Sequence, residues 1–154
     1  MNKRTVLIVV LGLAALLPHD ALAQATVTPF TATEDQCVVL YPGAWTFADG
    51  NIQIRGLLLK CQETSSTALY GGENLIVVNA NLRAVEGAFL GGIGPIWGTF
   101  QMENWAGTWE GKSGSSGVTY NAQGQGSGDR VGMKVWISTN NGQASGRILD
   151  PQGT

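Results

Sequence analysis

Residues 133–149, MKVWISTNNGQASGRIL, decide the fold class of this chain. Apolar and polar side chains alternate from Met133 to Ser138, with the two-residue period of a β-strand that buries one face. The dipeptide Asn141-Gly142 follows, and such a pair is the strongest short-range signal for a tight hairpin turn. Ala144–Leu149 then leads back along the first strand. The stretch therefore predicts a β-hairpin.

Similar short segments, separated by clusters of glycine, asparagine and serine, recur along the chain. Outside the N-terminal segment no stretch keeps the apolar spacing of an amphipathic helix, and 22 of the 154 residues are glycine. With about eight strands joined mostly by short turns, the pattern predicts a single all-β domain, an antiparallel, calycin-like β-barrel. The other predicted strands are Cys37–Tyr41, Trp45–Phe47, Asn51–Cys61, Asn74–Arg83, Trp97–Glu103, Thr108–Lys112 and Val118–Gln123.

A glycine inside the longest predicted strand, Asn51–Cys61, marks a change in the pattern. Ile52 and Ile54 share one face, and after Gly56 the apolar positions are displaced by one residue. Such a shift at a glycine predicts a β-bulge, which bends a strand and helps a sheet to close. The segment Gly87–Pro95 is apolar and rich in glycine, and it predicts a loop or lid.

The N-terminal segment has the three parts of a secretory signal peptide. Lys3 and Arg4 give a positive start, residues 6–17 form an apolar run, and Ala21-Leu22-Ala23 is a small-residue cleavage site. The run is shorter than the roughly 20 residues that a membrane-spanning helix needs. We therefore predict cleavage after Ala23 and a β-barrel domain over residues 24–154, secreted or periplasmic and without a membrane span. An uncleaved N-terminal anchor is the alternative.

The two cysteines, Cys37 and Cys61, predict a disulfide, because an exported chain folds in an oxidising compartment. In the chain-entropy description such a bridge stabilises the fold by roughly 3 kcal/mol. The alternative is a pair of buried thiols. A metal site is not expected, because two cysteines without further soft ligands do not make one.

The single histidine, His19, lies in the predicted signal peptide. The processed chain therefore has no imidazole for a Ser-His-Asp or Cys-His mechanism. A formal net charge of −2, with basic residues scattered singly, gives no basic stripe for nucleic acid. The glycines of Gly124–Gly128 lie between strand patterns and not before a helix, which favours turns over a phosphate site. We expect no metal and no cofactor.

One predicted hairpin brings two carboxylates to the same face. If residues 104–107 form the turn, Glu103 faces Thr108 and Gln101 faces Glu110. The two glutamates are then diagonal neighbours, roughly 7–8 Å apart at Cα. A carboxylate pair can act as acid and base, and comparable carboxyl separations occur in inverting glycosidases. Glu103 and Glu110 are the candidate catalytic residues, and a solvated hairpin face is the alternative.

Five tryptophans are many for a domain of this size. Trp97 and Trp136 fall on the polar side of their strands, whereas Phe100 and Trp109 fall on the apolar side. Exposed aromatic faces can stack on sugar rings or mark a protein interface. These four residues are the candidate ligand-binding residues. The alternative is that they pack the two faces of the barrel.

Three segments, GTFQMENWAGTWEG, GQGSGDRVGMKVW and SGRILDP, resemble small exported bacterial proteins that look like distant members of the allene oxide cyclase and dirigent barrel superfamily. The resemblance covers the chain from Trp45 to Pro151 and rests mostly on turn glycines and aromatic residues. It implies an eight-stranded antiparallel barrel, often trimeric, with an apolar cavity. No catalytic residue of the cyclases matches a position here, so cyclase activity is not implied.

These observations favour an exported, non-enzymatic β-barrel that binds a small apolar or amphipathic ligand in its mouth, with the loop before Trp97 as a cover. The first alternative is an isomerase, cyclase-like or carbohydrate-active enzyme that uses Glu103 and Glu110. The second is a structural or adhesive surface protein with Trp97 and Trp136 at a subunit interface. A homo-oligomer is compatible with this pattern.

Overall fold

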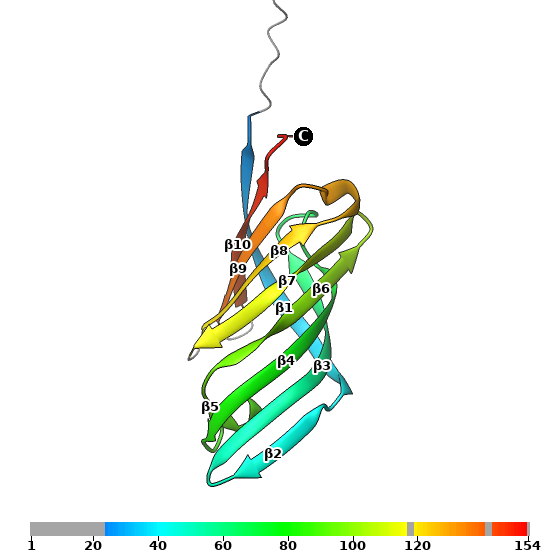
Figure 1. Cartoon of the computed structure of the whole chain (residues 1–154). Coiled ribbons are helices and arrows are strands. Elements are labelled where there is room, and N and C mark those ends of the chain that lie inside the picture. The colour runs from blue at the N-terminus through cyan, green and yellow to red at the C-terminus, as the bar shows by residue number, and fades with distance from the viewer. Residues whose placement is uncertain (1–23, 117–118, 141–142, 154) are drawn as a thin grey trace, which may run out of the picture.

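A computed structural model describes residues 24–116, 119–140 and 143–153, so the predicted signal peptide and the Asn141-Gly142 turn lie outside the described residues. The described chain forms ten strands and two 3-10 helices (Figure 1). Both helices are single turns, and neither is long or apolar enough to cross a membrane. The elements are β1 (Thr26–Tyr41), β2 (Ala44–Ala48), β3 (Asn51–Ser65), β4 (Gly72–Ala84), η1 (Phe89–Gly91), β5 (Gly92–Ile93), β6 (Ile96–Asn104), β7 (Gly107–Ser116), β8 (Thr119–Gly126), η2 (Gly128–Arg130), β9 (Lys134–Asn140) and β10 (Gln143–Asp150).

Eight of these strands close into one antiparallel barrel, which confirms the predicted fold class. The ring runs β1, β3, β4, β6, β7, β8, β9, β10, and β10 pairs with β1 to complete it. The other two strands lie outside the ring, β2 beside β3 and β5 beside β4. Because the strands are strongly tilted, β3 and β4 continue beyond the ring toward the lower end of the molecule (Figure 1).

The predicted bulge in β3 is present. The register with β4 shifts between Ile54 and Leu57, and Gly56 has a φ of 68°. A side chain at this φ is strained, so glycine suits the extra residue of the bulge. The bend it produces lets one long strand pair with β2 over its first part and with β1 over its last part.

β1 is longer than the sequence predicted, since it begins at Thr26 and not at Cys37. Its first residues pair with β10 alone, because pairing with β3 begins at Ala32. A strand with one neighbour tolerates Pro29, which has no backbone N–H to donate. Residues 31–36, TATEDQ, lack the apolar alternation that predicts a strand, because one inward-facing position is a glutamate.

The segment Gly87–Pro95, predicted as a loop or lid, contains η1 and the short strand β5, which pairs with β4. A Cβ atom at Gly91 would lie 3.5 Å from Cδ1 of the buried Ile52. Half-buried Leu90 also packs against the core. This segment therefore covers the buried face of β3 and β4 at the lower end of the sheet.

Large side chains fill the upper half of the barrel. Trp109 is fully buried, and its indole N–H donates to the carbonyl of Leu69 at 2.8 Å. The buried guanidinium of Arg130 lies 5.4 Å from the Trp109 ring and donates to the carbonyl of Gly107 and to the side chain of Asn104. These contacts close the upper end.

Glycines on the inner faces of β7 and β8 make room for the ring of Phe100. A Cβ atom at Gly111 or Gly124 would lie 2.6 or 2.8 Å from that ring, closer than real carbon contacts. Phe100 is accordingly buried in the core. The small and large side chains on facing strands complement each other, as the interior of a small barrel requires.

The predicted disulfide is confirmed. Cys37 of β1 lies directly opposite Cys61 of β3 in the strand register, and the two sulfurs are bonded. The last residue of β1 that pairs with β10 is Thr33. The bridge therefore holds β1 against β3 in the part of β1 that no longer pairs with β10.

Candidate functional site at the open end of the barrel

The four aromatic residues predicted to bind a ligand do not form one site. Phe100 and Trp109 are buried inside the barrel and belong to its packed core. Trp97 of β6 and Trp136 of β9 lie on the outer surface of the wall. Each carries an arginine against its ring at 5.1 Å, Arg55 on Trp97 and Arg147 on Trp136.

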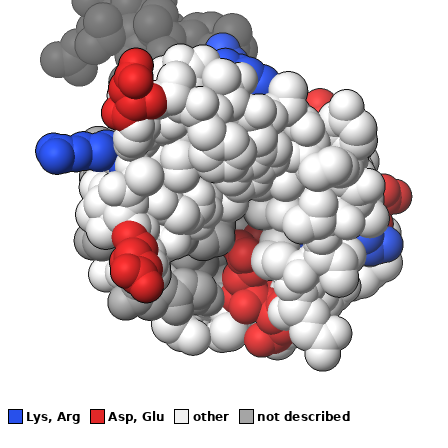
Figure 2. Space-filling view, turned by 90° about the horizontal axis from the view of Figure 1, so that it is seen from below, with Lys and Arg blue, Asp and Glu red and all other residues white. Residues whose placement is uncertain are grey.

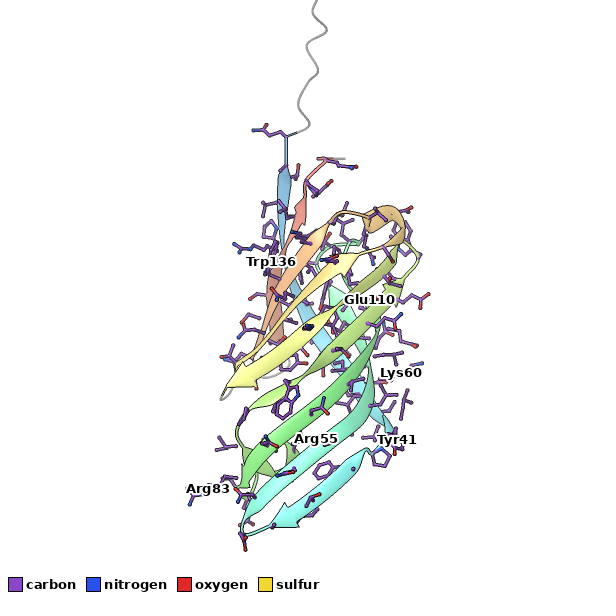
Figure 3. All side chains as sticks on the ribbon, viewed as in Figure 1. Tyr41, Arg55, Lys60, Arg83, Glu110 and Trp136 are labelled. Atoms are coloured by element: carbon purple, nitrogen blue, oxygen red, sulfur yellow. A yellow bond between two sulfur atoms is a disulfide. The ribbon has the colours of Figure 1, made fainter. Side chains whose placement is uncertain are left out.

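The two glutamates predicted as an acid–base pair have the expected register but not the surroundings that catalysis requires. Glu103 pairs with Thr108 and Gln101 pairs with Glu110, as the hairpin predicted. Both glutamates are exposed on the outer face of the barrel. Trp136 and Glu110 lie on different strands of the wall (Figure 3). An acid–base pair must converge on a concave site, so this pair has no geometric support.

The outer surface of β7–β10 has two shallow, adjoining hollows, of about 620 and 640 Å³. Both are lined by Lys112, Gln123 and Trp136, and the second also reaches Glu110. Their other lining groups are mainly glycine, serine and amide side chains. Trp136 lies in both hollows, with the Arg147 guanidinium against its ring.

The inside of the barrel opens at the lower end. Along β7 the inward-facing side chains change from fully buried Trp109 to Ser113, which is 8% exposed, and then to half-buried Ser115. Along β9 the series from Val135 to Thr139 follows the same course. Figure 2, a view onto this end, shows a hollow with acidic side chains on its wall.

Two carboxylates face each other inside this end. Glu34 of β1 is directly opposite Glu63 of β3, on the inward side of both strands. Glu34 follows the last residue of β1 that pairs with β10, so it lies where the wall opens. Glu63 is 7% exposed and accepts hydrogen bonds from the side-chain amide of Asn74 and from the hydroxyl of Tyr70.

Aromatic rings and hydroxyls complete the surroundings of the carboxylates. The Tyr70 ring stacks on Phe30 with a centroid distance of 4.3 Å, which connects the acidic residues to the packed core. On the opposite side of the interior, the hydroxyl of Tyr120 donates to the hydroxyl of Ser113. The negative charge of Glu34 and Glu63 acts on both tyrosines, so the six residues form one group, here called the inner acidic cluster: Glu34, Glu63, Tyr70, Asn74, Ser113 and Tyr120.

Burial disfavours the charged forms of these groups. It raises the pKa of Glu34 above its usual value. Burial also raises the pKa of Glu63, and the charge of Glu34 adds to this rise, while hydrogen bonds from Asn74 and Tyr70 oppose it. Burial is also the main reason why the pKa of Tyr70 lies well above its usual value. The cluster therefore favours the neutral forms of these groups more than water does.

One acceptor of the cluster has no donor. The side-chain oxygen of Asn74 is buried and has no hydrogen-bond partner among the described residues. Neither Glu34 nor Glu63 forms an ion pair within the described part of the chain. A buried acceptor without a donor costs about 1–3 kcal/mol, so a donor from outside the chain would stabilise this arrangement.

Glu34 also approaches the disulfide. One of its carboxyl oxygens lies 2.7 Å from the sulfur of Cys37 and 3.5 Å from that of Cys61. The three groups lie close enough together to resemble a metal site. However, bonded sulfurs are not thiolates and do not serve as the anionic ligands that soft metals bind. The geometry therefore does not favour a metal ion here.

Sequence reasoning did not find this cluster, although part of its signal was present. Glu63 continues the inward parity of Cys61, and Asn74 begins the inward parity of Ile76 and Val78. A polar residue on the apolar parity of a strand indicates a buried polar site. Glu34 gave no such signal, because its segment was not predicted to be a strand.

Comparison of the chain with known protein families, with curated proteins and with solved structures finds no match. The comparisons therefore leave the resemblance to the allene oxide cyclase and dirigent superfamily untested, and it stays a prediction. Function has to be inferred from the geometry of the barrel itself.

Proposed function

We propose that this protein is an exported β-barrel that binds a small amphipathic molecule at its open end, through a head group that donates hydrogen bonds. The observation that carries the proposal is the inner acidic cluster. Glu34 and Glu63 offer carboxyl oxygens at one place, beside the buried and unpartnered oxygen of Asn74, inside a barrel that is open on that side. A primary amine or a polyol supplies the donors that these groups lack.

Apolar side chains near the cluster suit a ligand that also has an apolar part. Half-buried Leu59 and Ala122 pack against the core from the open end, and Ile137 and Ala144 lie deeper on the barrel wall. An apolar chain against these side chains gains about 25 cal/mol for each Å² removed from water. Small-molecule sites typically combine such walls with a few polar groups that fix orientation.

The disulfide supports the predicted destination of the protein. A bond between Cys37 and Cys61 persists in an oxidising compartment and is rare in the reducing cytosol. A secreted or periplasmic location, reached by means of the predicted signal peptide of residues 1–23, is therefore part of the proposal.

Three probes with the same alkyl chain test the proposal: n-decylamine, decyl glucoside and decanoate. We expect calorimetry to detect binding of the amine or the glucoside and to give no signal for decanoate, whose carboxylate would face Glu34 and Glu63. Glu34→Gln should weaken amine binding by at least about tenfold, since a charge-assisted hydrogen bond contributes about 1.5–3 kcal/mol. Glu110→Gln, the same change on the outer wall, is the matched control. Failure of all three probes, or equal binding by both variants, would contradict the proposal.

A second candidate function is acid–base catalysis by Glu34 and Glu63 in place of Glu103 and Glu110. The observation that favours it is the raised pKa of two adjacent carboxyl groups in a concave site. One group could give a proton while the other accepts one, as an isomerase requires. Solvent hydrogen exchange into a bound ketone probe, followed by NMR, tests this function. Loss of exchange in Glu63→Gln but not in Glu103→Gln is expected, and no exchange in the unmodified protein would exclude it.

A further inference from the structure

An exposed apolar surface lies outside the barrel, where β1 ends and β2 begins. Six large apolar side chains between residues 38 and 47 are each 38–68% exposed. Tyr41 projects at this edge, away from the closed part of the barrel (Figure 3). We call this surface the apolar edge, and its members are Val38, Val39, Leu40, Tyr41, Trp45 and Phe47.

The backbone along the apolar edge also lacks a neighbour. β1 pairs with β3 from Cys37 to Tyr41, but its pairing with β10 has already ended at Thr33. β2 is the last strand of the sheet and pairs with β3 alone in the described part of the chain (Figure 1). Edge strands of monomeric proteins are usually protected by charged residues, bulges or proline. β2, with the sequence AWTFA, has none of these.

These two properties together select the kind of partner. A lipid surface could cover the side chains, but it could not satisfy the free N–H and C=O groups of an edge strand. Another strand satisfies both the backbone and the side chains. The partner should therefore be an extended polypeptide segment.

The sequence of β2, AWTFA, is nearly palindromic. Threonine is at its centre, with an aromatic residue and then an alanine on each side. If two copies pair antiparallel about a two-fold axis at Thr46, Trp45 of each copy lies opposite Phe47 of the other. Within one chain these two rings already stack, with a centroid distance of 6.1 Å. Such a pairing would create a cluster of four aromatic rings on one face of a continuous sheet.

We infer that β2 is a self-association strand and that two copies of this chain join edge to edge through it. The interface is isologous, as two-fold dimers require. The six side chains carry no charge, so the two-fold axis brings no like charges together. Trp45 and Phe47 lie within the paired strands, and the exposed side chains of residues 38–41 extend the apolar surface beyond them. The inference does not depend on ligand binding in the barrel.

Phe47→Asp tests the inference through the aromatic cluster. Light scattering after size-exclusion chromatography should give a dimer for the unmodified protein and a monomer for the variant. Each dimer loses two aromatic contacts and gains two buried charges, so we expect the dissociation constant of the dimer to rise at least about 100-fold. Trp105→Asp, which replaces an 83% exposed aromatic residue in the β6–β7 turn, is the matched control and should leave the dimer intact.

A charge exchange at the two-fold axis separates this geometry from other modes of association. Thr46→Lys and Thr46→Glu should each weaken the dimer, because like charges then lie directly opposite, and an equimolar mixture should recover it as a heterodimer. With the Thr46→Glu variant labelled with nitrogen-15, native mass spectrometry distinguishes the three species by mass, and Thr99→Lys on the outer wall is the control. A monomeric unmodified protein, a dimer that survives in Phe47→Asp, or a mixture without heterodimers would each overturn the inference. Binding of the monomer to phosphatidylcholine vesicles would do so in favour of a lipid surface.

Discussion

The two ends of this barrel are built from the same strands, but their interiors differ in packing and in charge. At the upper end, Trp109 fills the interior and the Arg130 cation closes it, with partners on neighbouring turns. At the lower end, Glu34 and Glu63 face each other beside the unpartnered oxygen of Asn74, and β1 no longer pairs with β10. Stability is therefore expected to depend on the upper end, and recognition on the lower end.

The largest expected effect comes from emptying the upper end. Trp109→Ala should destabilise the protein by about 3–5 kcal/mol, because it leaves a large cavity and an unpaired carbonyl at Leu69. Urea denaturation measures the change. Trp105→Ala, on the exposed turn of the same hairpin, should change stability by less than about 0.5 kcal/mol. Similar values for the two variants would mean that the upper end is not the stabilising core.

Removal of the disulfide should have the next largest effect, and at the lower end. The double variant Cys37→Ala and Cys61→Ala should lose about 2–4 kcal/mol, since the bridge restricts the unfolded chain. Backbone amides of β1 beyond Thr33 should also exchange hydrogen faster, because in this part of β1 the pairing is with β3. Hydrogen exchange measured by NMR would show whether the loss is local. Uniform acceleration throughout the barrel would argue against a separately held lower end.

Gly124→Ala tests the fit of the core in the middle of the barrel. The new methyl group would lie 2.7 Å from the carbonyl oxygen of Glu110 and 2.8 Å from the Phe100 ring, so we expect a loss of about 1–3 kcal/mol in thermal unfolding. Gly114→Ala is the control on the same wall, since its nearest neighbour is a carbonyl oxygen at 3.3 Å. An equal loss in the two variants would contradict a tight fit between β7 and Phe100 at this position.

The smallest expected effect is a change in pH dependence at the lower end. Because burial raises the pKa of Glu63 above the usual 4.5, the folded state favours its protonated form. The contribution of the protonated Glu63 to folding stability is complete below about pH 4.5. It is lost as the pH rises through the raised pKa. Glu63→Gln cannot ionise, so its stability relative to the unmodified protein should increase between acidic and neutral pH. Glu110→Gln should show no such trend, and a trend of opposite sign would refute the raised pKa.

The sequence predicted the elements that depend on local pattern. Alternation between glycine turns predicted the barrel, and the shift at Gly56 predicted the bulge. Two cysteines in an exported chain predicted the disulfide. It also predicted the register that pairs Gln101 with Glu110. Each of these follows from spacing along the chain, which is visible without knowledge of distant contacts.

The candidate site was not predicted, because its members meet only through pairing between strands that are distant in sequence. Glu34 and Glu63 are far apart in sequence and become partners when β1 pairs with β3. The inward side of a polar segment such as residues 31–36 cannot be distinguished from its outward side by pattern alone. Phe100 and Trp109 were assigned to a ligand site, whereas they lie in the packed core, since an apolar side chain on an inward position serves equally in a core or a cavity wall.

The most direct test of the open acidic end is to measure the two carboxyl pKa values. NMR of carboxyl carbons, with Glu34→Gln and Glu63→Gln used for assignment, follows each group through a pH titration with and without n-decylamine. We expect both pKa values to lie above 4.5 in the free protein and to fall when the amine binds, because a cation favours the charged carboxylates. Ordinary pKa values that the amine leaves unchanged would contradict this account.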